Sequence, residues 1–270
     1  MSRFAPVVPA HIALFMQGES IAEDILGGYH LLLAHDVVKH PSLYRRVYEE
    51  VRRRYEDSFI ILDNSVVELG DAVGLSMMVE AAKIVKPDCI VIPDVMNDGA
   101  ATRYRASEFG REYMRELHQD EELNELNIPL MGVIQGKHYD DWIESAFYYY
   151  CMPNVSYIGV PRVVTKAVGS RMPLLHSLLR HEYFQGVHLL GFSDNVLDDV
   201  CCARMPGVDG IDSAVPIRAA LAGIPMTIDQ PKDYGSRGHF WETSLEKVYR
   251  SVNAITDNVC LVRRWIGETK

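Results

Sequence analysis

Gly207-Val208-Asp209-Gly210-Ile211-Asp212-Ser213-Ala214-Val215-Pro216-Ile217-Arg218 is a short apolar run that closes on a carboxylate. It predicts a buried strand followed by a turn and a helix, because Ser213 and Pro216 suit the first positions of a helix. The pattern places Asp212 at the C-terminal edge of that strand. In a βα barrel this edge is the active-site face.

The same arrangement recurs at four earlier apolar runs. Each of them closes on a polar or small residue, and these residues are Asp63, Asp94, Gln135 with Gly136, and Gly159. An Asp after a strand is also the ordinary N-cap of the next helix, so each position alone leaves both interpretations open. The recurrence favours a single pocket on which these residues converge.

Strands and helices are predicted to alternate along the chain. We expect strands at His11–Met16, Gly27–His35, Phe59–Asp63, Cys89–Asp94, Leu130–Gln135, Val155–Gly159, Val187–Phe192 and Val208–Asp212. We expect helices at 42–55, 75–85, 101–126, 138–150, 167–183 with a break at Pro173, 195–204 and 241–255. This order predicts an α/β fold, a (β/α)8 TIM barrel that forms one domain over residues 1–270, with a C-terminal loop and helix from about Gly223.

Composition excludes some classes of protein. The 270 residues are 48% hydrophobic and carry a net charge of −10, which argues against a generally basic nucleic-acid binder but leaves room for a local basic face. The five cysteines are odd in number and scattered apart from one adjacent pair, as in reduced cytosolic proteins. No apolar run is long enough for a membrane span. We expect a protein of the cytoplasm, the host's if a virus encodes it.

The carboxylates suggest a chemistry. Asp212 and Asp63 facing each other across a barrel mouth suit displacement at an anomeric carbon, with one carboxylate as nucleophile and the other as proton donor and acceptor. Asp94, an amide from Gln135 and a backbone N–H from Gly159 supply the acceptors and donors that read the edge of a purine-like base.

At this point the motifs resemble a family, the tRNA-guanine transglycosylases, and most closely their short DpdA-like relatives that act as 7-deazaguanine DNA transglycosylases. Seven short segments are similar to the family's motifs and follow in the family's order over about residues 10 to 222. They are Ile25–Leu33, Leu62–Ser65, Ile92–Asp94, Gly132–Gly136, Tyr157–Val160, Leu189–Phe192 and Gly210–Arg218.

The resemblance implies roles for individual residues. Asp212 would be the nucleophile that forms a glycosyl-enzyme intermediate, and Asp63 the general acid and base. Asp94, Gln135, Gly136, Gly159 and Val160 would bind the base, and Arg162 and Arg218 would contact nucleic acid. The expected reaction is that of a pentosyltransferase, which replaces guanine with a free 7-deazaguanine base and needs no cofactor. The target nucleotide must leave the base stack to reach such a pocket.

Two departures from the family change what the resemblance implies, and the second of them determines the expected polymer. The Ser-Gly-Gly that follows the family's aspartate is Asn64-Ser65-Val66 here, and the family's zinc subdomain is missing because Cys260 is the only cysteine after Arg218. That subdomain helps the tRNA enzymes to hold RNA, so we favour DNA as the substrate and expect no metal. The alternatives are a tRNA-guanine transglycosylase, a non-catalytic base-binding partner subunit and a nucleoside hydrolase. A homodimer is left open.

Two further expectations concern the surroundings of the pocket. Arg45, Arg52, Arg162 and Arg218 would form a basic rim that binds a polyanion in a salt-sensitive way. Arg237 and His239 lie in a Gly-rich loop that either covers the pocket or stays in solvent.

Overall fold

The computed structural model describes residues 2–17, 25–180, 183–228 and 238–268. Eight parallel strands form one sheet in the order β1-β8-β7-β6-β5-β4-β3-β2. They are β1 (Arg3–Pro6), β2 (Tyr29–Leu33), β3 (Phe59–Asp63), β4 (Cys89–Val91), β5 (Leu130–Val133), β6 (Val155–Pro161), β7 (Gly186–Leu190) and β8 (Val208–Ser213). β1 pairs with β8 and packs beside β2, which leaves a nearly closed ring.

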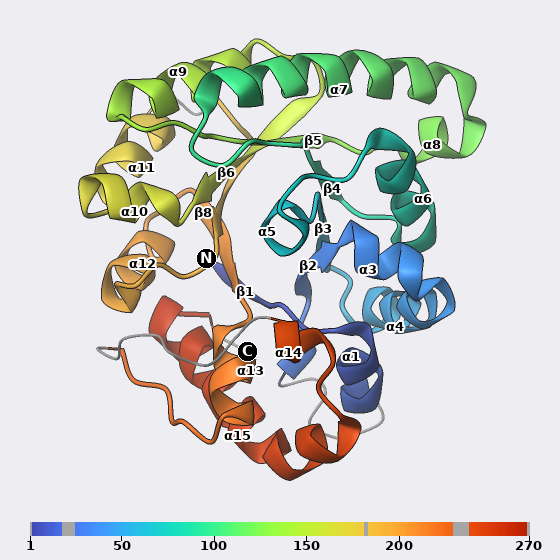
Figure 1. Cartoon of the computed structure of the whole chain (residues 1–270), viewed down its shortest axis with the longest axis vertical. Helices are drawn as coiled ribbons and strands as arrows, with labels where there is room; N and C mark the ends of the chain where they lie inside the picture. The colour runs from blue at the N-terminus through green and yellow to red at the C-terminus, as the bar shows by residue number, and fades with distance from the viewer. Residues whose placement is uncertain (1, 18–24, 181–182, 229–237, 269–270) are drawn as a thin grey trace.

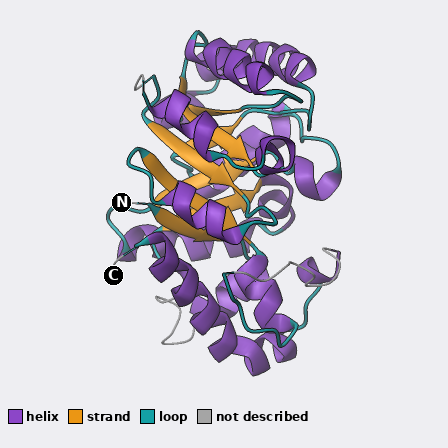
Figure 2. Cartoon of the chain, turned by 90° about the vertical axis from the view of Figure 1, so that its left-hand side faces the viewer, coloured by secondary structure: helices purple, strands orange, loops and turns teal. Residues whose placement is uncertain are grey.

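Helices surround these strands (Figures 1 and 2). They are α1 (Ala10–Gln17), α3 (Ala34–Lys39), α4 (Pro41–Arg54), α5 (Val66–Leu69), α6 (Leu75–Val85), α7 (Gly99–Gln119), α8 (Glu121–Leu126), α9 (Tyr139–Tyr150), α10 (Val163–Val168), α11 (Met172–Leu179), α12 (Val196–Ala203), α13 (Val215–Leu221), α14 (Gly238–Trp241) and α15 (Leu245–Ile266). The fold is the predicted (β/α)8 barrel.

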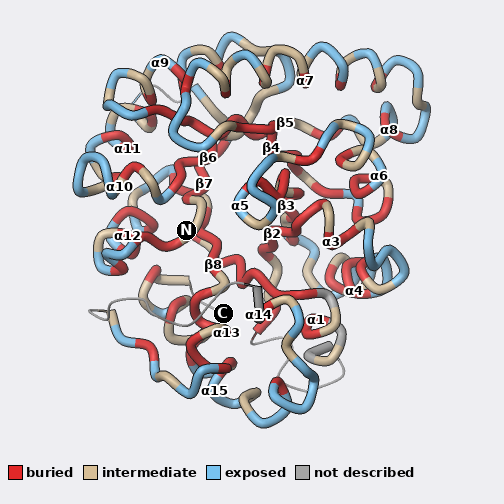
Figure 3. Tube along the Cα trace, in the orientation of Figure 1, coloured by how far each residue is buried: buried red, intermediate tan, exposed pale blue. Residues whose placement is uncertain are grey.

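The strands are buried on both sides, as their red trace in Figure 3 shows. Alternate side chains point into the barrel, where Tyr29, Leu31 and Leu33 of β2 belong to the inner apolar cluster. Leu32 between them belongs to the outer cluster, which fills the space between strands and helices. This two-residue period determines which side chains of each strand reach the barrel interior.

The expected first strand at His11–Met16 is wrong, because these residues belong to α1 and the first strand is Arg3–Pro6. A run of five apolar residues fits a buried helix as well as a strand, so the pattern alone does not distinguish them. The true β1 has only four residues and ends in a proline, which is tolerated there because β1 is the end strand of the hydrogen-bonded sheet.

Several helices differ in extent from the prediction. The expected helix 101–126 is divided at Asp120, whose carboxylate accepts a hydrogen bond from Leu123 N at 3.0 Å and caps α8. The expected helix 167–183 is divided into α10 and α11 around Gly169, which has a φ of 82°. The C-terminal helix begins later and ends later, since Ser244 caps α15 and the helix continues to Ile266.

Candidate active site

A cavity of about 410 Å³ opens at the C-terminal ends of the strands. The structure brings six of the predicted site residues to its wall: Asp63, Asp94, Gln135, Arg162, Asp212 and Arg218. They come from segments that are far apart in sequence and meet because all eight strands run in the same direction. The strand ends therefore predicted the location of this cavity.

Gly136, Gly159 and Val160 are not among the described lining residues. Val160 occupies an outward position of β6 and is fully buried in the outer cluster. Gly159 points inward, but a Cβ there would lie 2.8 Å from Leu190 Cδ1, so Leu190 covers it. Gly136 lies against helix α9 instead, where a Cβ would meet the Asp141 side chain at 2.3 Å.

Asp212 is held from the strand beside it. Its Oδ1 atom lies 3.1 Å from His188 Nε2 and accepts a hydrogen bond from Gly191 N at 3.0 Å. Both contacts come from β7 and the turn that follows it, because β7 and β8 are neighbours in the sheet. One carboxylate oxygen of Asp212 thus has the Gly191 N–H as a donor and the His188 imidazole within hydrogen-bond distance.

Asp63 lies in a different environment. Burial raises the pKa of its carboxyl well above the ordinary value, and the negative charge of Glu68 raises it further. Asp94 and Asp212 contribute in the same direction, while a hydrogen bond of 2.8 Å from Ser65 N lowers the pKa. Ser65 reaches this position with a φ of 63°, in the left-handed region. The surroundings of Asp63 therefore raise the pKa of its carboxyl, with burial as the largest cause.

A buried polar group forms another part of the wall. Asp94 is 3% exposed and accepts hydrogen bonds from Asn64 Nδ2 at 2.8 Å and Gln135 Nε2 at 2.7 Å. The Oε1 atom of Gln135 accepts one from Asn97 N at 3.0 Å, which fixes the orientation of its amide. Burial raises the pKa of Asp94, and the two amide donors oppose that shift. Asp94 and Gln135, which line the cavity, thus add carboxylate oxygens and an amide to its wall.

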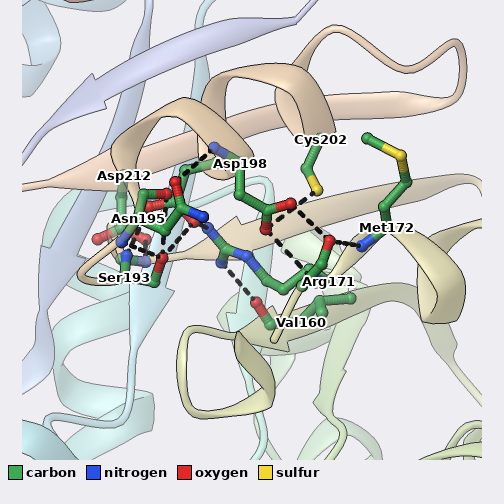
Figure 4. A network of polar contacts seen from close by, with 11 residues as sticks. Val160, Arg171, Met172, Ser193, Asn195, Asp198, Cys202 and Asp212 are labelled. Atoms are coloured by element: carbon green, nitrogen blue, oxygen red, sulfur yellow. Dashed lines mark hydrogen bonds and ion pairs between the residues drawn. The ribbon is translucent and has the colours of Figure 1, made fainter. Parts of the chain in front are cut away.

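Behind Asp212 lies a second polar network (Figure 4). Arg171 and Asp199 form an ion pair in which both side chains are fully buried, with Nη2 2.6 Å from Oδ1. Arg171 also donates to the Val160 carbonyl at 3.2 Å, and Asp199 accepts from Ser193 N at 2.6 Å. The network joins the end of β6 to the turn after β7, which carries Gly191. It therefore supports the backbone that donates to Asp212.

One side of the cavity rim carries basic side chains, and the opposite side carries exposed apolar ones. Arg162, Lys166 and Arg218 line it on the side of β6 to β8. Val67 and Met96, which are both exposed, line it on the opposite side, after β3 and β4. The expectation that Arg52 belongs to a basic rim is wrong. It pairs with Asp88 at 2.7 Å, beside the loops that enter β3 and β4, at the other end of the barrel.

The C-terminal segment completes the wall. Phe240 and Trp241 of α14 line the cavity, and the Trp241 indole lies edge-on to His35 with 6.3 Å between ring centroids. Trp241 is half-buried, whereas Phe240 is buried. Arg237 lies outside the described residues, and the structure describes no side chain for His239.

Sequence reasoning missed His188, Tyr29, Glu68 and Trp241. For His188 and Tyr29 a signal existed, since both are polar residues at inward positions of predicted strands. Glu68 and Trp241 stand on short helices, α5 and α14, that no periodicity marks.

The fold and the cavity together define a class, a (β/α)8 barrel with inward carboxylates at the C-terminal ends of its strands. In comparisons with known proteins, no family model matches the chain and no curated sequence shows a significant match. The resemblance to the transglycosylases rests on the motifs quoted above. In the parts of the chain that the structure describes, no group of three or more metal-ligating side chains is placed to hold an ion. None of the described helices has the length and apolarity to cross a membrane.

Proposed function

We propose that the protein is a base-exchange glycosyltransferase that replaces guanine in DNA with a 7-deazaguanine derivative. The observation that carries this proposal is the contrast between two inward carboxyl groups of one cavity. Asp212 accepts a hydrogen bond from Gly191 N and lies 3.1 Å from His188 Nε2, whereas burial and Glu68 raise the pKa of Asp63. A pair of carboxyl groups in environments that separate their protonation states supplies a nucleophile and an acid.

The first half-reaction joins sugar to protein. A carboxylate oxygen of Asp212 attacks C1′ of the extruded guanine nucleotide, and the C1′–N9 bond breaks with its electron pair passing to the base. Asp63 donates its proton to the departing guanine, which leaves as a neutral molecule. The product is an ester between Asp212 and C1′, and Asp63 is now a carboxylate.

The second half-reaction reverses these roles. Asp63 accepts the N9 proton of the incoming 7-deazaguanine, whose nitrogen attacks C1′ while the ester bond breaks. Asp212 returns to a carboxylate, Asp63 to a carboxylic acid, and the number of bonds is unchanged. The chemistry requires no metal or redox partner.

The remaining wall suits a flat, polar-edged base. Asp94 accepts hydrogen bonds and Gln135 donates them at the same patch of wall, which matches a purine edge with both donors and acceptors. Trp241 offers an aromatic face and Leu190 an aliphatic one, and both line the cavity. A base held between such faces gains stacking energy.

DNA is favoured over tRNA because residues 219–270 contain a single cysteine, Cys260, where the resemblance to the tRNA enzymes would lead us to expect the cysteine cluster of a zinc subdomain. The basic side of the rim, with Arg162 and Arg218, suits phosphates on either side of an extruded nucleotide.

The test measures incorporation of a labelled base into DNA or tRNA. Purified protein is incubated with radiolabelled guanine or 7-deazaguanine and either duplex DNA or bulk tRNA, and label is counted in each polymer. The proposal predicts label in DNA and none with Asp212→Asn. The matched control Asp257→Asn changes an exposed carboxylate on α15 and should exchange normally.

Other outcomes favour other functions. Label in tRNA alone would replace the DNA assignment with tRNA modification. Release of free base without incorporation would indicate a hydrolase. Absence of both reactions would favour a base-binding partner subunit, and normal exchange by Asp212→Asn would exclude the proposed nucleophile.

A further inference from the structure

Behind Asp212 a chain of hydrogen bonds runs through the inside of the barrel. The Tyr29 hydroxyl lies 2.9 Å from His188 Nδ1, and His188 Nε2 lies 3.1 Å from Asp212 Oδ1. The three side chains stand on β2, β7 and β8. Tyr29 and His188 are 2% and 1% exposed, so water cannot replace either contact. The chain therefore ends at one oxygen of the proposed nucleophile.

The direction of these hydrogen bonds follows from the phenol. Burial raises the pKa of Tyr29 well above its ordinary value, and Asp209 raises it further, while Arg3 opposes the shift. Tyr29 therefore stays protonated, and its hydroxyl donates a hydrogen bond to His188 Nδ1. A neutral imidazole then carries its own proton on Nε2, which points at Asp212. The opposite tautomer would place a nitrogen lone pair against a carboxylate lone pair.

The packing holds Tyr29 in place. Arg3 lies over its ring, with the guanidinium carbon 4.5 Å from the ring centroid, and Phe59 stacks on the ring at 5.8 Å. The absence of a side chain at Gly210 leaves room for the Tyr29 ring, because a Cβ there would lie 2.3 Å from Tyr29 Cε1. The ring is thus confined on several sides, and its hydroxyl has a fixed position relative to β7 and β8.

We propose that Tyr29 and His188 are positioning residues that, together with Gly191 N, hold Oδ1 of Asp212 and leave Oδ2 as the atom that attacks. This inference rests on the proposed function and specifies its nucleophilic atom. After attack, Oδ1 is the carbonyl oxygen of the ester and accepts the same two donors. Both donors bind a carboxylate more strongly than an ester, so they favour departure of Asp212 in the second half-reaction.

Two replacements of His188 distinguish the effect of the position of its N–H donor from the effect of the size of its side chain. His188→Gln carries an amide nitrogen close to the place of Nε2, whereas His188→Asn carries one close to the place of Nδ1. We expect His188→Asn to lower kcat by about 100-fold with little change in KM, as for loss of one donor to the group that changes charge in the reaction, here the Asp212 carboxylate. His188→Gln should keep kcat within about 10-fold of the wild type.

Tyr29→Phe tests the tautomer. It removes one oxygen atom from a confined ring and leaves His188 without the partner that fixes its protonated nitrogen. We expect kcat to fall by at least about 10-fold, because loss of a tautomer-fixing partner is costly even where geometry survives. Urea unfolding of each variant checks that the protein folds. Equal activity of His188→Gln and His188→Asn, or an effect on KM alone, would overturn the proposal.

A measurement on the unmodified protein needs no activity. Nitrogen-15 NMR of the imidazole groups, with the His188 signals identified by their loss in His188→Gln, reports which ring nitrogen carries the proton. We expect the Nε2–H tautomer, and the Nδ1–H tautomer would refute the chain. If the wild type exchanges no base, the proposed function fails while this tautomer can still be observed. If the wild type exchanges base and His188→Asn does so equally well, only the positioning chain fails.

Discussion

At the scale of the residue, the site depends on two aspartates that occupy the same kind of position in different surroundings. Asp63 and Asp212 each stand near the C-terminal end of a strand and point into the barrel. Burial and Glu68 raise the pKa of the first, while Gly191 N donates to the second and the His188 imidazole lies beside it. The strand pattern predicts the positions of both, but not their surroundings, because those come from α5 and from the neighbouring strand.

The raised pKa of Asp63 makes a prediction about stability. A group whose pKa is higher in the folded state stabilises the fold less as pH rises above its unfolded value of about 3.9. Asp63→Asn stays neutral at every pH, so we expect it to be more stable than the wild type at pH 7. The difference should vanish below about pH 3.9. Urea unfolding at both pH values measures this.

The same variant lacks the proposed acid, so its exchange rate should fall by about 10² to 10⁴. Asp257→Asn provides the matched control, since its carboxylate is exposed on α15 and should show no such pH-dependent gain. A destabilised Asp63→Asn at pH 7 would contradict a raised pKa of Asp63 in the folded protein.

The buried ion pair gives a second prediction at this scale. Arg171→Met leaves Asp199 buried without its cation, and we expect a loss of about 3–5 kcal/mol in the free energy of unfolding. The double variant Arg171→Met with Asp199→Leu should recover part of that loss, because no charge then stays buried. Arg250→Gln, in an exposed pair with Glu246, should change little. Equal losses for the Arg171 and Arg250 variants in urea unfolding would contradict this account.

At the scale of the element, strands were more predictable than helices. Seven strands lie where apolar runs place them, since buried parallel strands are almost continuously apolar. The helices at the cavity were harder to predict. α5 and α14 have only four residues each, too few for a 3.6-residue period to appear. For that reason the contributions of Glu68 and Trp241 could not be predicted.

At α14 we predict that Trp241 stacks on the base. Loss of a stacking aromatic costs about 1–3 kcal/mol, so Trp241→Ala should bind free 7-deazaguanine about 10- to 100-fold more weakly, and Trp241→Phe less so. Trp fluorescence of the wild type should be quenched by the base. Quenching should persist in Trp265→Phe, whose position lies on α15 away from the cavity lining. Full quenching in Trp241→Phe would argue against stacking.

At the scale of the whole molecule, the proposed binding of a polyanion requires a local basic surface, because the protein as a whole is acidic. The net charge is −10, yet Arg162, Lys166 and Arg218 gather on one side of the cavity rim. The sequence indicated Arg162 and Arg218 because they follow strand ends. It could not show that Arg52 lies at the opposite end, since that depends on its pairing with Asp88.

This charge distribution predicts salt-dependent binding of DNA. Arg162→Gln should weaken binding and reduce the slope of log K against log salt concentration by about 1. Arg53→Gln, near the end of α4 that leads into β3, provides the control and should leave the slope unchanged. Titration of a fluorescent duplex at several salt concentrations gives both slopes. An unchanged slope for Arg162→Gln would remove this residue from the interface.

The measurement that tests the central claim most directly is mass spectrometry of the denatured protein after incubation with a guanine-containing DNA duplex and no incoming base. Asp212 as nucleophile predicts a covalent protein–DNA adduct that lacks one guanine, with the attachment mapped to Asp212. Addition of 7-deazaguanine before denaturation should discharge the adduct, and Asp212→Asn should form none. An adduct mapped to Asp63, or base exchange without any adduct, would contradict the account.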